Sequence, residues 1–96
     1  MANFMVEVDV PSDKRNEAIK RFTEGSALQI PDGARLAGPR WQKVASLGAW
    51  MVVETDNPSV LYDWLLSWND ILDVKVTPVI SDEDAGALFQ KHGLSA

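Results

Sequence analysis

The four tryptophans of this 96-residue chain are its strongest indication of a ligand site. Trp64 and Trp68 lie one helical turn apart within the segment Ser59–Val79, which organises the rest of the chain. Large aromatic side chains either fill the space between a helix and a sheet or form the walls of a pocket for a planar apolar ligand. Both interpretations stay open, because each places these two indoles against the same core.

Polar and aromatic side chains near these tryptophans complete the candidate site. Asn69 and Asp70 follow Trp68 directly, where they lie at the mouth of a pocket or simply form a turn. The guanidinium of Arg35 or Arg40 suits an anionic or carbonyl group of a ligand. The predicted ligand-binding residues are Tyr62, Trp64, Trp68, Asn69, Arg40 and Trp41.

Sites of other kinds find little support in the sequence. His92 is the single histidine, and the acids Asp82–Asp84 are better explained as the start of a helix, so we expect no metal site. The sequence has no Walker-type phosphate loop and no dinucleotide-binding fingerprint, and one histidine near the end of the chain makes a Ser-His-Asp triad unpromising. We therefore expect no cofactor and assign no catalytic residue.

The composition is that of an ordinary globular domain with an acidic balance. Hydrophobic residues make up 46% of the chain and charged residues 24%, and the formal net charge is -5. Because binding to a nucleic-acid backbone needs a basic surface, we expect no nucleic-acid partner. The chain has no cysteine, so disulfides and thiolate metal sites are excluded. Since no signal peptide or membrane-spanning apolar run is recognised, we expect one cytoplasmic domain over residues 1–96.

The first half of the chain predicts a strand, a helix and a long connection. Residues 3–10 alternate between apolar and polar side chains, as a strand with one buried face does. Residues 13–24 follow as an amphipathic helix. The connection Gly25–Pro39 is long for a compact domain, and its apolar residues are expected either to cover a cavity at the tryptophans or to plug the core. These residues are Leu28, Ile30 and Leu36.

The second half predicts a hairpin, a helix and a strand. The strands Trp41–Ala45 and Ala49–Thr55 flank a short turn, and the second is apolar enough to be central in a sheet. A helix is expected from Pro58 to Trp68 after the cap residue Asn57, with an apolar stripe about 140° wide. Residues 72–79 then return to a period of two.

A last helix is expected after Ser81, which is a good cap and is followed by three acids. Its predicted apolar contacts are Ala85, Leu88 and Phe89, and it ends near His92.

This order of elements predicts an α+β fold of the ferredoxin-like βαββαβ type plus a C-terminal helix. The four strands are expected to form an antiparallel sheet with two helices on one face, and right-handed crossovers place the first strand beside the third and the fourth. The other face is expected to carry apolar residues beside its charged ones. These apolar residues are Met5, Trp41, Met51, Val53 and Val79. A face this apolar should not be left in water, so we expect a homodimer through the outer sheet face.

Several motifs resemble a known family. They are Tyr62-x-Trp64, Trp68-x-Asp70, Pro78-Val79 before the acidic helix start at Asp82, and Gly38-x-x-Trp41 upstream. With them the chain resembles an uncharacterised family of short bacterial proteins grouped with the dimeric α/β-barrel superfamily. The resemblance covers nearly the whole chain and implies a ferredoxin-like monomer whose sheet packs face to face with that of a partner. It supplies no established activity and no catalytic residues.

Three functions are compatible with these features. The first is a small homodimeric binding or regulatory module with an apolar, aromatic-lined pocket. The second is a cofactor-independent monooxygenase or isomerase that acts on an aromatic substrate held against Trp64 and Trp68. The third is a structural or partner-binding dimer without a pocket. A cavity beside Trp64 is the feature that separates the first two from the third.

Overall fold

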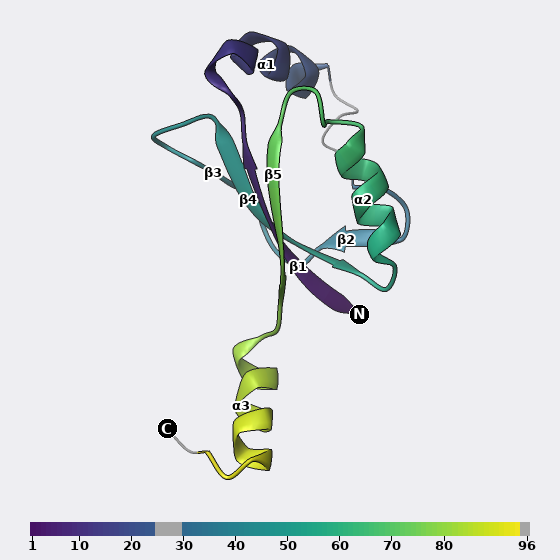
Figure 1. Cartoon of the computed structure of the whole chain (residues 1–96), viewed down its shortest axis with the longest axis vertical. Coiled ribbons are helices and arrows are strands. Elements are labelled where there is room, and N and C mark those ends of the chain that lie inside the picture. Colours follow the sequence, from purple (N-terminus) through teal and green to yellow (C-terminus); the bar gives the residue numbers. More distant parts are fainter. Residues whose placement is uncertain (25–29, 95–96) are drawn as a thin grey trace.

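An antiparallel sheet forms the centre of the protein (Figure 1). The structure is a computed structural model, in which residues 1–24 and 30–94 are described. The strands are β1 (Ala2–Asp9), β2 (Ala34–Leu36), β3 (Trp41–Gln42), β4 (Gly48–Thr55) and β5 (Asp73–Val79). The helices are α1 (Arg15–Thr23), α2 (Pro58–Leu66) and α3 (Asp82–Lys91), and a 3-10 turn, η1 (Ser12–Lys14), precedes α1. The predicted α+β class and antiparallel sheet are confirmed.

The described part of the chain contributes five strands to the sheet, where the sequence predicts four. The strand order is β2-β4-β1-β5, and β3 also pairs with β4. The extra strand β2 comes from the predicted connection Gly25–Pro39, and the predicted strand Trp41–Ala45 is reduced to two residues. Leu36 pairs with Val53 and Trp41 pairs with Trp50, so β2 and β3 lie one after the other along the same edge of β4.

The two faces of β4 are the reverse of the prediction. Met51 and Val53 are buried on the face that α2 covers, in the core cluster that includes Val6 and Leu61. Trp50, between them, points to the other face, where it lies opposite Glu7 of β1. A strand with apolar residues at every central position has no polar residue to fix its phase, and the pairing with β1 decides it.

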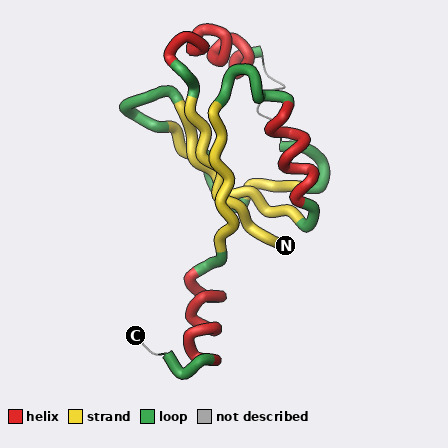
Figure 2. Tube along the Cα trace, in the orientation of Figure 1, coloured by secondary structure: helices red, strands yellow, loops and turns green. Residues whose placement is uncertain are grey.

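Helix α2 lies over one face of the sheet (Figures 1 and 2). The predicted cap is confirmed, because the backbone N–H of Ser59 donates to Asn57 Oδ1 over 3.1 Å. Leu61 is the fully buried contact of α2 with the core. The helix ends at Leu66 rather than at the predicted Trp68. Trp68 lies in the following turn, where its backbone N–H donates to the carbonyl of Leu65.

Helix α1 lies across the end of the sheet rather than along its face (Figure 2). Ala18 of α1 is completely buried, in a second core cluster with Val10, Trp68 and Ile71. Val10 follows β1 and Ile71 precedes β5, so the cluster closes that end of the sheet. The prediction placed two helices on one face of the sheet. The structure places α2 on that face and α1 at the end of the sheet.

The long connection is fixed to the end of β4 by a buried hydroxyl. Thr55 Oγ1 donates to the carbonyl of Gly33 over 2.8 Å and accepts from the N–H of Asn57 over 3.1 Å. Gly33 has a φ of 90°, a conformation that favours glycine. Leu36 packs against the first core cluster, Ile30 is half-buried, and Leu28 lies outside the described residues.

Helix α3 projects beyond the end of β5 (Figure 1), and the molecule measures 52 × 30 × 19 Å. The predicted cap is present, since the N–H of Asp84 donates to Ser81 Oγ over 3.0 Å. Leu88 and Phe89, which were expected to pack, are exposed instead, Phe89 by 55%. The expectation was wrong because it assumed that an apolar stripe must find its partner within the same chain.

Candidate functional site

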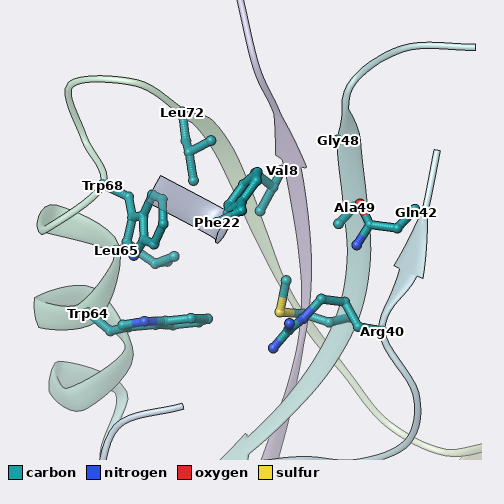
Figure 3. Close-up of a pocket in the computed structure, with 11 residues that line it drawn as sticks. Val8, Phe22, Arg40, Gln42, Gly48, Ala49, Trp64, Leu65, Trp68 and Leu72 are labelled. Atoms are coloured by element: carbon teal, nitrogen blue, oxygen red, sulfur yellow. The ribbon is translucent and has the colours of Figure 1, made fainter. Parts of the chain in front are cut away.

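A cavity of about 250 Å³ lies between α2 and the sheet (Figure 3). Its walls come from α1, α2 and the turn that follows it, β1, β3 and β4. Most of its wall is apolar. The lining residues are Val8, Phe22, Arg40, Gln42, Gly48, Ala49, Met51, Trp64, Leu65, Trp68 and Leu72.

Three aromatic rings form one side of the cavity. Trp64 projects from α2 three residues after the buried Leu61, so it follows the apolar stripe of the helix. Trp68 belongs to the turn after α2 and is buried, and Phe22 from α1 lies 5.4 Å from it between ring centroids, tilted by 31°. This tilted pair closes one end of the cavity, and the half-buried Trp64 lines the cavity while it packs against the first core cluster.

Arg40 and Gln42 supply the polar side chains of the lining. Gln42 belongs to β3 and Arg40 directly precedes that strand, and residues two apart on a strand point to the same side. Arg40 extends toward the indole of Trp64 (Figure 3). A guanidinium opposite an indole in an apolar cavity can bind a carboxylate or carbonyl oxygen while the ring stacks on a flat ligand.

An ion pair holds α1 against the turn after α2. Both terminal nitrogens of Arg21 donate to the carboxylate of Asp70, with 3.1 Å between Nη1 and Oδ1. The bond from Arg21 lowers the pKa of the Asp70 carboxyl, and the bond to Asp70 raises the pKa of the Arg21 guanidinium. Since Phe22 adjoins Arg21 and Asp70 lies two residues after Trp68, the pair orients the two rings at that end of the cavity.

The six predicted ligand-binding residues fall in three places. Trp64, Trp68 and Arg40 line the cavity together. Tyr62 and Asn69 line a groove on the other side of α2, and Trp41 lies on the opposite face of the sheet. Arg35, the other candidate cation, donates from Nε to Glu54 Oε2 over 2.6 Å and does not line the cavity.

The prediction missed Phe22 and Gln42. A sequence signal existed for Gln42, because a residue two positions from Arg40 shares its side of a strand. The helical pattern of residues 13–24 predicts that Phe22 is buried, but no local signal shows that it packs on Trp68 and lines the cavity, because the two rings are far apart in the chain. Neither Ile30 nor Leu36 lines the cavity, so neither covers it as the prediction supposed.

Comparison with protein families identifies the chain. The model of the family described as "Domain of unknown function (DUF3303)" matches residues 2–93. The chain belongs to the DUF3303 family. No curated protein and no solved structure matches it. The family membership confirms the expected relationship to an uncharacterised family and assigns no function.

The groove on the other side of α2 is a second apolar concavity of this DUF3303 domain, and we call it the α2–β5 groove. Its volume is about 420 Å³. Leu65 and Leu72 form part of both its wall and that of the cavity. Its lining residues are Phe4, Pro58, Leu61, Tyr62, Leu65, Leu66, Asn69, Leu72, Val74 and Val76, none of which is charged.

The face of the sheet away from α2, the outer face, carries further apolar residues. Trp41 and Trp50 pair across β3 and β4 and are both exposed. Lys43 Nζ lies 5.2 Å from the ring centroid of Trp50 and donates to Asp9 Oδ1 and Glu7 Oε2, each over 2.7 Å. The hydrogen bonds to these carboxylates raise the pKa of the Lys43 ammonium group, and the bond to Asp9 has the larger effect. The charges of the outer face are thus partly neutralised within the chain.

Within residues 1–24 and 30–94, no group of three or more His, Cys, Asp or Glu side chains is placed to hold a metal ion. None of the helices in the same ranges is both long enough and apolar enough to cross a membrane.

Proposed function

We propose that this DUF3303 protein is a small homodimeric binding module for a planar aromatic ligand that carries an anionic or carbonyl group. The observation that carries the proposal is the position of Arg40 opposite Trp64 in a cavity whose wall is otherwise mostly apolar. A flat ring system stacks on the indole of Trp64, and its oxygen accepts hydrogen bonds from Arg40. Gln42 offers an amide to a second polar group of the ligand.

The size of the cavity limits the ligand to a small molecule. Pockets for drug-sized ligands range from roughly 300 to 1,000 Å³. With about 250 Å³, this cavity lies just below that range. We therefore expect a ligand of one to two fused rings rather than an extended polycycle.

The lining favours binding over catalysis. Proton transfer needs a group that both gains and loses a proton near neutral pH, most often a histidine or a carboxylate. Among the described residues that line the cavity, Arg40 is the only charged one, and a guanidinium stays protonated. This observation ranks the binding module above a cofactor-independent monooxygenase or isomerase.

The proposed architecture is a ferredoxin-like monomer that dimerises through its outer face. Two strands along the same edge of β4 are consistent with one interrupted strand, and counting β2 and β3 together restores the order βαββαβ. Exposed Trp41 and Trp50, beside charges that neutralise one another, make the outer face suitable for burial. The absence of cysteine suits a reducing compartment, and we propose the cytoplasm.

Titration of tryptophan fluorescence with 2-naphthoate tests the proposed site. We expect the emission to change on binding, because the ligand stacks on Trp64. Arg40→Gln should weaken binding about 10- to 100-fold, since a hydrogen bond to a charged group contributes about 1.5–3 kcal/mol. The matched control is Arg35→Gln, which removes a guanidinium bonded to Glu54 outside the cavity and should leave the affinity unchanged.

A neutral analogue, 2-naphthalenemethanol, completes the experiment. It should bind the unmodified protein more weakly than naphthoate does, and Arg40→Gln should remove that preference. An absence of any emission change at millimolar ligand, or equal losses in the two arginine variants, would contradict the proposed site.

A further inference from the structure

Helix α3 has an apolar side that nothing in the described chain covers. Ala85, Leu88 and Phe89 lie within about 100° of one another around the helix axis. The helix makes no extensive contact with another described helix or strand. A helix of ten residues is marginal in water by itself, so α3 needs a surface to pack against.

The α2–β5 groove is an uncovered surface of matching size and chemistry. Tyr62, Leu66 and Val76 in its lining are exposed, Leu66 by 53%. The groove runs beside α2, which has nine residues, and α3 has ten, so the two helices have nearly the same length. Neither the lining of the groove nor the apolar side of α3 carries a charge. Two copies of an acidic chain can therefore meet there without bringing like charges together.

The connection between β5 and α3 directs the helix away from its own groove. Only Ile80 and Ser81 separate the two elements, and the backbone at Ser81 is extended, with φ −71° and ψ 160°. The helix therefore continues beyond the end of β5 instead of turning back over the sheet (Figure 1). The radius of gyration of 15.9 Å exceeds the roughly 13 Å of a compact domain of this length, in agreement with an element that projects outward.

We propose that α3 of one copy docks in the α2–β5 groove of a second copy, which returns its own α3 to the first. The exchange gives every helix one groove, as a two-fold symmetric interface requires. Four surfaces of about 300–400 Å² each, the size of an ordinary apolar surface patch, bury about 1,200–1,600 Å² together, which is enough for a stable interface. Pro78 on β5 lacks an N–H, so packing of side chains fits this edge better than addition of a strand.

The exchange uses a different concavity from the ligand site, with only Leu65 and Leu72 lining both, and a different face of the sheet from the outer-face dimer. It uses the side of the sheet that α2 covers, whereas the proposed outer-face contact uses the other side. Failure of one interface therefore leaves the other untouched, and the naphthoate titration reports separately on the cavity.

Cross-linking of single-cysteine variants tests the exchange, and the absence of native cysteine makes the test specific. Full-length Phe89→Cys and Leu66→Cys chains are mixed, allowed to exchange subunits and treated with a short bismaleimide. We expect a covalent heterodimer of twice the 10.6 kDa chain mass. The matched control is Gln90→Cys mixed with Leu66→Cys, because Gln90 lies on the other side of α3 and should cross-link at least tenfold less.

The double variant Leu66→Cys, Phe89→Cys distinguishes docking in the same chain from docking in a second copy. Exchange predicts that the cross-linked product has twice the chain mass. A product of single-chain mass would overturn the proposal, because α3 would then occupy its own groove. The proposal also fails if no heterodimer forms, or if Gln90→Cys and Phe89→Cys give the same yield.

Discussion

Gly48 restricts how the cavity wall is built. A Cβ atom at this position would lie 2.3 Å from the carbonyl oxygen of Val8, which is backbone and cannot turn aside. The residue also pairs with Asp9 in the sheet and lines the cavity. The close approach of β1 and β4 at this end therefore depends on glycine.

Gly48→Ala is expected to destabilise the protein by about 1–3 kcal/mol, because the added methyl group forces the two strands apart. Urea unfolding followed by circular dichroism measures the change. The matched control is Gly86→Ala in α3, where a Cβ meets nothing within 4 Å and alanine is the better helix former. Unchanged stability of Gly48→Ala would show that β1 and β4 separate there without cost.

Single residues also show which parts of the site can be predicted from local sequence patterns. The helical spacing of Trp64 and Trp68 and the charge of Arg40 were readable from the sequence, and all three side chains line the cavity. The burial of Phe22 was readable from the helical pattern, but its place in the cavity was not, because it follows from the packing of α1 on Trp68. Side chains brought together by such distant pairs leave no local pattern.

At the scale of elements, the helix starts and strand faces that could be predicted were those fixed by polar residues at defined positions. Asn57 and Ser81 marked the starts of α2 and α3, and the alternation of β5 separated its two faces correctly. Strand β4 has no polar marker at its centre, so its phase was predicted wrongly. Strand β2 was missed because its three residues lie in a segment rich in glycine and proline, which is typical of a loop.

The contact between α1 and the turn after α2 is expected to weaken in acid. Arg21 holds the pKa of the Asp70 carboxyl below its usual value of 3.8 in the folded protein. A carboxyl with a lowered folded pKa contributes stability above its unfolded pKa and loses that contribution as the pH falls through the folded pKa. Asp70→Asn should therefore lower the melting temperature at pH 7, and the difference from the unmodified protein should shrink toward pH 3.

Thermal unfolding at several pH values measures this difference. Asp63→Asn is the control, because it removes a carboxylate from the exposed side of α2 and leaves the Arg21 pair intact. A difference between Asp70→Asn and the unmodified protein that stays constant from pH 7 to pH 3 would contradict the role of the ion pair.

At the scale of the whole molecule, the uncovered outer face leads to a prediction about assembly. Val52→Asp places a charge on the outer face opposite Met5 of β1, and it should halve the mass of the assembly in sedimentation equilibrium. Val44→Asp, a fully exposed position before β4, is the control and should leave the mass unchanged. If the Val52→Asp assembly keeps its full mass, the outer face is not an interface. The cross-link between Phe89→Cys and Leu66→Cys chains should survive Val52→Asp in either case.

The central position of β1 has a consequence for how the chain folds during synthesis. Strand β1 is the first to leave the ribosome, yet its two neighbours in the sheet, β4 and β5, come from residues 48–55 and 73–79. Its apolar residues Val6 and Val8 have no sheet partner until residues 48–55 have been made, and β1 is enclosed only when β5 arrives. Pairing over such long separations slows folding. We expect the sheet to form late and in one step, after β5 is available, rather than strand by strand as translation proceeds.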